Sequence, residues 1–159
     1  MDIKKSVLIL FSYFLFSGLY YLDYPINKDI PGDIDNWYYV AKFNFFINEI
    51  KAFLFGNINN SFFYPDEHPA LNGEPSYGLF LLWLPIKLVL NSDYWSYLLL
   101  LIIIQSLNAF AVFHLTLSYL PSRDIVAAFL AGIFFTFSTY INANNDNINT
   151  IAFFAGIFS

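Results

Sequence analysis

The sequence predicts an all-α integral membrane protein, a multi-pass helical bundle with a large first external loop that carries juxtamembrane amphipathic helices. Three apolar runs, 6–22, 94–120 and 125–141, have lengths suited to crossing a bilayer. The stretch 23–93 between the first two runs is polar, acidic and rich in aromatic residues. Charged residues make up 12% of the chain, whereas soluble domains carry about 25%. We therefore expect residues 1–159 to form a single membrane domain with a sizeable structure at one membrane face.

The first run is expected to anchor the chain with its N-terminus in the cytoplasm. Lys4 and Lys5 precede it, and cytoplasmic flanks of membrane helices are enriched in Lys and Arg. A cleaved signal peptide is the competing interpretation. Leu19–Leu22 is bulky where a small-residue cleavage site would be needed, so the sequence favours the anchor.

The external stretch contains two expected helices. Apolar residues recur at helical spacing over 37–55, which predicts an amphipathic helix along the membrane surface, with Lys42 off its apolar stripe. The apolar segment 77–90 has a length typical of interfacial or re-entrant helices. If it does not span, residues 142–150 face the same compartment as 23–93. If it spans, Arg123 lies outside, which fits the charge rule less well.

Composition and chain length exclude several classes of protein and site. The chain has no Cys, which excludes disulfides and thiolate sites, and its net charge of −5 argues against a nucleic acid partner.

Residues 151–159 form an apolar run too short to cross a bilayer. We expect a truncated crossing, so that this is the N-terminal part of a longer protein whose missing C-terminal transmembrane helices would be its partners.

Acidic residues in two loops are candidates for chemistry. Asp33 and Asp35 follow the first crossing and precede the amphipathic helix; they suit helix capping, or a carboxylate that acts as general base or metal ligand. Asp146 lies in an Asn-rich stretch that suits a solvated loop. If 77–90 does not span, Asp33 and Asp146 share a face, where they could flank a divalent cation such as Mg²⁺ or Mn²⁺ that binds a substrate diphosphate.

The segment 62–69 combines aromatic, acidic and imidazole side chains. Tyr64, Glu67 and His68 are candidates for substrate binding, because aromatic rings stack on sugars and the other two groups could serve as a base. Anchoring of the loop at the membrane interface is the alternative role for the aromatics. Within the second run, Gln105 and Asn108 are expected to make hydrogen bonds between helices.

The order of these segments resembles the front of the GT-C superfamily, multi-pass glycosyltransferases that use lipid-phosphate-linked sugars, and is most similar to its uncharacterised bacterial branch. The matching features are Gly32-Asp33-Ile34, the amphipathic helix, Phe62–Pro65, the short apolar segment, Leu107-Asn108 and Phe137-Ser138. Relatives in that branch often carry a Gly-His pair in the second loop, where this chain has Asn144-Asn145-Asp146-Asn147.

The resemblance implies a function and a location. It implies transfer of a sugar from a polyprenyl-phosphate donor to an acceptor at the outer face of a bacterial inner (plasma) membrane, in construction of the cell envelope. Asp33, with Asp35 as a weaker claimant, takes the catalytic or metal-binding role, and the bilayer and the lipid-linked sugar donor are the partners. The fragment by itself is expected to be inactive. The alternative is a non-catalytic membrane scaffold or accessory subunit, or a truncated remnant.

Overall fold

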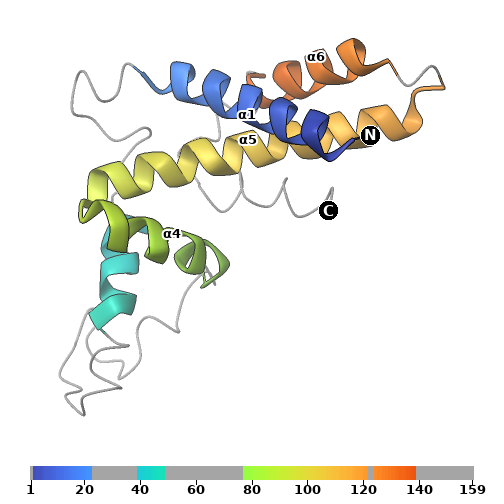
Figure 1. Ribbon diagram of the computed structural model, residues 1–159. Coiled ribbons are helices and arrows are strands. Elements are labelled where there is room, and N and C mark those ends of the chain that lie inside the picture. Colours follow the sequence, from blue (N-terminus) through green and yellow to red (C-terminus); the bar gives the residue numbers. More distant parts are fainter. Residues whose placement is uncertain (1, 23–38, 49–76, 122–123, 139–159) are drawn as a thin grey trace.

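The computed structural model describes residues 2–22, 39–48, 77–121 and 124–138, and within these ranges helices are the only regular secondary structure (Figure 1). Two of the helices, α1 and α5, are long and apolar enough to cross a membrane. The predicted all-α class is therefore confirmed for the described part of the chain. In order, the elements are α1 (Ile3–Tyr20), a helical stretch at 39–48, α4 (Tyr77–Leu90), α5 (Asp93–Tyr119) and α6 (Ile125–Thr136).

Polar side chains at the start of three helices set where those helices begin. Asp2 accepts a hydrogen bond from the backbone N–H of Lys4, and Ser92 accepts one from that of Trp95. Asp124 accepts from the N–H groups of the first turn of α6. Such residues satisfy donors that have no partner inside the helix. The predicted short helix at 77–90 is confirmed with the same bounds.

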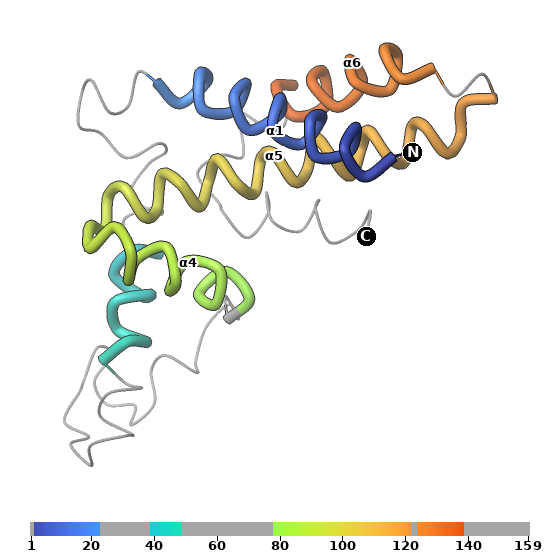
Figure 2. Tube along the Cα trace, in the orientation of Figure 1, coloured from blue at the N-terminus to red at the C-terminus, as the bar shows by residue number. Residues whose placement is uncertain are grey.

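The long helix α5 is the centre of the fold and contacts α1, α4 and α6 (Figure 2). Ring contacts of Tyr13 with Phe129 and of Tyr20 with Phe137 show that α1 and α6 run in the same direction. The side-chain amide of Gln105 in α5 bonds to the carbonyl of Thr136, the last residue of α6. Gly132, which comes earlier in α6, lies close to Ala109, which comes later in α5. The helix α5 is therefore antiparallel to both α1 and α6, as Figure 1 shows.

The helix α6 is shorter than the apolar run that predicted it. We expected a crossing over 125–141, but the helix ends at Thr136, and Phe137 forms its C-cap. Its 12 residues extend about 18 Å, well short of a hydrocarbon core of roughly 30 Å. The carbonyl of Thr136 accepts the side-chain amide of Gln105 from α5, so the helix end is satisfied by a neighbouring helix. Residues 139–141 lie outside the described ranges.

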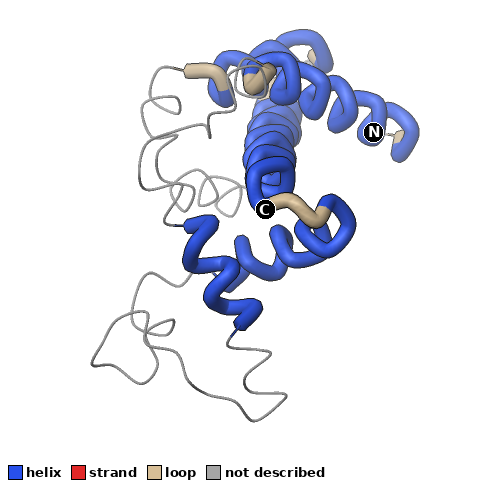
Figure 3. Tube along the Cα trace, turned by 90° about the vertical axis from the view of Figure 1, so that its left-hand side faces the viewer, coloured by secondary structure: helices blue, strands red, loops and turns tan. Residues whose placement is uncertain are grey.

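A second layer packs beside the N-terminal half of α5, as Figure 3 shows. It consists of α4 and the helical stretch 39–48, which meet through ring contacts of Phe43 with Phe80 and Trp83. The predicted amphipathic helix is thus observed over 39–48, and the remainder of 37–55 lies outside the described residues. One expectation was wrong: Lys42, placed off the apolar stripe, is only 5% exposed.

Helices α1, α5 and α6 meet at a close junction formed by Tyr13, Ala109 and Gly132. The Tyr13 hydroxyl donates a 3.0 Å hydrogen bond to the carbonyl of Phe129, and the two rings stack with centroids 4.9 Å apart. A β-carbon built on Gly132 would clash with the Tyr13 hydroxyl and with the backbone carbonyl of Ala109. Glycine is therefore the residue that lets α6 approach the other two helices so closely.

Candidate functional site

The end of α1 and the start of α5 lie at one end of the helical bundle, which we call the rim end; α6 points toward this end and stops beside Gln105, twelve residues into α5. Because α1 and α6 are parallel, the chain leaves both of them in the direction of the rim end, after Leu22 and Ser138. Because α5 is antiparallel to them, its N-terminus lies at the same end. The opposite end holds Lys4 at the start of α1 and Asp124 at the start of α6.

A buried aromatic cluster fills the space between the rim end and the second layer. We call it the rim cluster; it joins the end of α1, the stretch 39–48, α4 and the first half of α5 into one apolar core. Phe43 and Trp83 are fully buried at its centre, with ring centroids 5.3 Å apart. Burial of such large rings is the main source of stabilisation where the two layers meet. Its large aromatic members are Tyr21, Tyr39, Phe43, Phe45, Phe46, Phe80, Trp83 and Tyr97.

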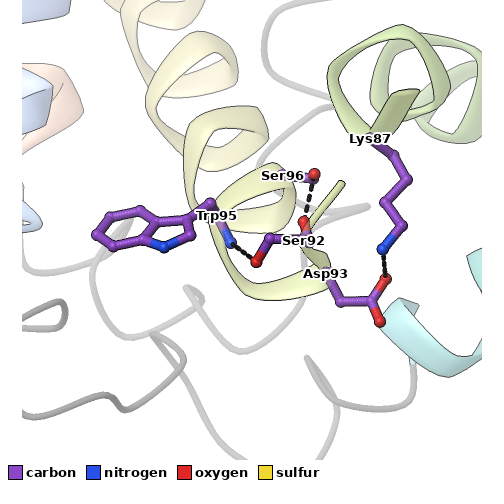
Figure 4. A network of polar contacts seen from close by, with 5 residues as sticks. All are labelled: Lys87, Ser92, Asp93, Trp95 and Ser96. Atoms are coloured by element: carbon purple, nitrogen blue, oxygen red, sulfur yellow. Dashed lines mark hydrogen bonds and ion pairs between the residues drawn. The ribbon is translucent and has the colours of Figure 1, made fainter. Parts of the chain in front are cut away.

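The turn between α4 and α5 is held by local polar contacts (Figure 4). Lys87 of α4 forms a 2.7 Å ion pair with the Oδ1 atom of Asp93, the first residue of α5. Ser92 caps α5, and its carbonyl accepts the hydroxyl of Ser96. Asn91 reverses the chain with a positive φ of 48°, a conformation that Asn tolerates better than most residues. These contacts fix the angle between the second layer and the bundle.

The residues expected to carry chemistry all lie outside the described ranges. Sequence connectivity nevertheless relates them to the rim end: the segment with Asp33 and Asp35 follows Leu22, and the segment with Asp146 follows Ser138. The segment with Tyr64, Glu67 and His68 joins the second layer, between 48 and 77. The expected placement of these six side chains around one site stays a prediction.

Titratable groups are sparse in the part of the chain that the structure describes. Among these residues no three His, Cys, Asp or Glu side chains gather as a metal site would require. The only His described, His114, is exposed on α5, and its ring packs edge-on against Phe110 at 4.5 Å.

An apolar groove of about 420 Å³ lies between α1 and α5, on the side of α1 away from Tyr13. Its one polar side chain, Ser106, donates its hydroxyl to the carbonyl of Ile102 at 2.6 Å. The groove therefore suits a hydrocarbon chain rather than a sugar or a phosphate. It is lined by Val7, Leu10, Phe11, Phe14, Ile103, Ser106 and Leu107.

Some buried polar groups were not singled out from the sequence. Ser17 and Thr136 are each 1% exposed. Both lie inside apolar runs, where a single hydroxyl residue does not by itself indicate a buried polar contact. Gln105 was expected to bond between helices, and its bond to the Thr136 carbonyl at 3.4 Å confirms this. The common signal is a hydroxyl or amide placed on the inward face of an apolar helix.

No known protein family, curated protein or solved structure matches the chain.

Proposed function

We propose that this chain is the membrane-embedded front part of a glycosyltransferase that takes its sugar from a polyprenyl-phosphate donor. The observation that carries the proposal is the common direction of α1 and α6. The chain leaves α1 after Leu22 and α6 after Ser138, and the candidate carboxylates Asp33 and Asp146 follow these two points in the sequence. In a membrane this arrangement suits a single external site at the outer face of a bacterial inner membrane, with α1 and α5 as the spanning helices.

In the proposed reaction an acceptor hydroxyl or amine attacks C1 of the sugar. The new bond to C1 forms as the bond from C1 to the phosphate oxygen breaks, and the lipid phosphate leaves with that electron pair. Asp33 either accepts the proton that the acceptor loses, as a general base, or holds a cation against the phosphate. Carboxylate oxygens of Asp33 and Asp146 are the ligand type that Mg²⁺ or Mn²⁺ prefers. A bound cation would offset negative charge on the leaving phosphate.

The groove between α1 and α5 supports a lipid-linked donor. Its lining is apolar apart from Ser106, whose hydroxyl is already bonded within its own helix. A prenyl chain bound there would bury apolar surface at about 25 cal/mol per Å². The phosphate and sugar would then extend toward the rim end, where the candidate carboxylates join the bundle.

A non-catalytic membrane subunit is the second candidate. The observation in its favour is the outer face of α1, where Leu8, Phe11, Leu15 and Leu19 are all exposed. Such a face suits contact with lipid or with a partner helix, whatever the chemistry of the loops.

The proposal is tested by Asp33→Asn in the intact protein. Loss of a general base lowers the rate of sugar transfer by about 10²- to 10⁴-fold, while protein abundance in membrane vesicles stays the same. Transfer is measured with a radiolabelled sugar on a polyprenyl-phosphate carrier. Asp29→Asn, a change of the same kind in the same segment, is the matched control and should retain activity. Equal activity in the wild type and Asp33→Asn would falsify the catalytic role of Asp33, and absence of transfer by the wild type would favour the non-catalytic subunit.

A further inference from the structure

Three buried polar side chains occupy one layer of the bundle, one helical turn from the Tyr13 junction toward the rim end. Four residues on from Tyr13 in α1 lies Ser17, and four residues on from Gly132 in α6 lies Thr136. Four residues back from Ala109 in the antiparallel α5 lies Gln105. Residues four apart share a helix face, so Ser17, Gln105 and Thr136 face the same interior. Their side chains are 1%, 0% and 1% exposed.

Each of these side chains has a buried polar atom without a hydrogen-bond partner. The atoms are the hydroxyl oxygens of Ser17 and Thr136 and the Oε1 atom of Gln105. Leaving a buried polar group unsatisfied costs about 1–3 kcal/mol, so three in one layer are unusual in a folded interior.

The orientation of the Gln105 amide is set by its neighbour. Its Nε2 atom donates to the Thr136 carbonyl at 3.4 Å. A flipped amide would place Oε1 against that carbonyl, with two acceptors facing each other. Oε1 must therefore point elsewhere in the layer, and it can only accept a hydrogen bond. The group that satisfies it has to be a donor.

We propose that this layer holds an internal water molecule that bridges Ser17, Gln105 and Thr136. Water donates to Gln105 Oε1 and exchanges hydrogen bonds with the two hydroxyls, which both donate and accept. Buried waters typically make about three hydrogen bonds to groups that are otherwise unsatisfied, which matches the three atoms of this layer. The bridge ties α1 to α5 and α6 close to the rim end, and it is independent of the proposed sugar transfer.

A double-mutant cycle tests the bridge in the full chain reconstituted in detergent micelles. Ser17→Ala and Thr136→Val each remove a hydroxyl with little change in volume. Each single variant raises the unfolding equilibrium constant about fivefold, the effect of one lost hydrogen bond. The double variant exceeds either single by less than about twofold, because the first change already breaks the shared bridge. Unfolding is followed by circular dichroism during titration with denaturing detergent.

The control cycle pairs Thr136→Val with Ser106→Ala. Ser106 is equally buried, but its hydroxyl bonds to the Ile102 carbonyl of its own helix, so its effect should add to that of Thr136→Val. A second readout is nuclear magnetic resonance: the side-chain amide protons of Gln105 should show a cross-peak to a long-lived water. Additive effects of Ser17→Ala and Thr136→Val would overturn the bridge. So would coupling without the water cross-peak, since the two hydroxyls would then bond directly.

Discussion

Gly132 is the residue at which a single methyl group decides how three helices pack. A β-carbon there would meet the Tyr13 hydroxyl and the backbone carbonyl of Ala109. The hydroxyl could move with its side chain, but the carbonyl belongs to the rigid backbone of α5. Helix α6 would therefore have to shift, and the 3.0 Å bond from Tyr13 to the Phe129 carbonyl would lengthen.

We predict that Gly132→Ala destabilises the fold by about 1–3 kcal/mol, the usual cost of overpacking a core. This cost outweighs the higher helix propensity of Ala, which alone would stabilise α6 by about 1 kcal/mol. The measurement is the free energy of unfolding in detergent. Gly18→Ala in α1 is the matched control, because nothing lies within 4 Å of a β-carbon built there. A Gly132→Ala protein as stable as the control would contradict the close junction.

At the scale of elements, the α4–α5 corner depends on a partly exposed ion pair. The side chains of Lys87 and Asp93 are 17% and 42% exposed, and their atoms approach to 2.7 Å. Exposure of Asp93 lets water and salt screen the attraction, so the pair contributes less than a buried one would. The Nζ atom of Lys87 also lies over the Trp83 ring, 6.0 Å from the ring centroid.

We predict that Lys87→Met lowers stability by about 0.2–1 kcal/mol at low salt, with the difference shrinking at 1 M NaCl. Methionine is likewise unbranched and removes the charge. Thermal unfolding at the two salt concentrations provides the measurement. Lys5→Met, at an exposed site in α1, is the control and should have no salt-dependent effect. A Lys87→Met difference that does not change with salt would show that packing, not charge, sets the corner.

The end of α6 shows how one element depends on another. The apolar run continues to Ile141, and nothing in its composition predicts a stop at Thr136. The stop coincides with the position where the Gln105 amide satisfies the Thr136 carbonyl. The Thr136 carbonyl therefore has a hydrogen-bond partner without a further turn of helix.

At the scale of the whole molecule, the arrangement of α1, α5 and α6 defines which chain segments share an end. Parallel α1 and α6 point the same way, so the chain leaves them in one direction, after Leu22 and Ser138, whereas Pro121 and Asp124 lie at the opposite end. This direction agrees with the topology in which 77–90 does not span. It brings Asp33 and Asp146 into one compartment if the bundle crosses a membrane.

Labelling of single cysteines tests that topology, and the chain has no native Cys to remove. We predict that Asn36→Cys and Asn145→Cys react with a membrane-impermeant maleimide in intact spheroplasts. Ser122→Cys, in the turn at the opposite end, should react only after lysis. The measurement is a mass shift on a gel after labelling. Reaction of positions 36 and 145 from opposite sides would contradict a common external site.

Much of the fold could be predicted from local signals. The apolar runs placed α1, α4 and α5 within a few residues of their observed ends, because hydrophobic patterning is a local property of the sequence. The burial of Lys42 was not predicted, since helical spacing identifies one apolar face and does not show what packs on the other. The six candidate site residues lie outside the described ranges, so they stay predictions.

By itself, the sequence determined that the described chain is helical and where most of its helices begin. Only the tertiary structure decided where α6 ends, and therefore that two helices and not three are long enough to cross a membrane, that α1 and α6 point the same way, and that Tyr13 and Gly132 form a junction. The reason is the distance along the chain over which these contacts act. Tyr13 bonds to a carbonyl 116 residues away, and no local pattern of side chains encodes such a meeting.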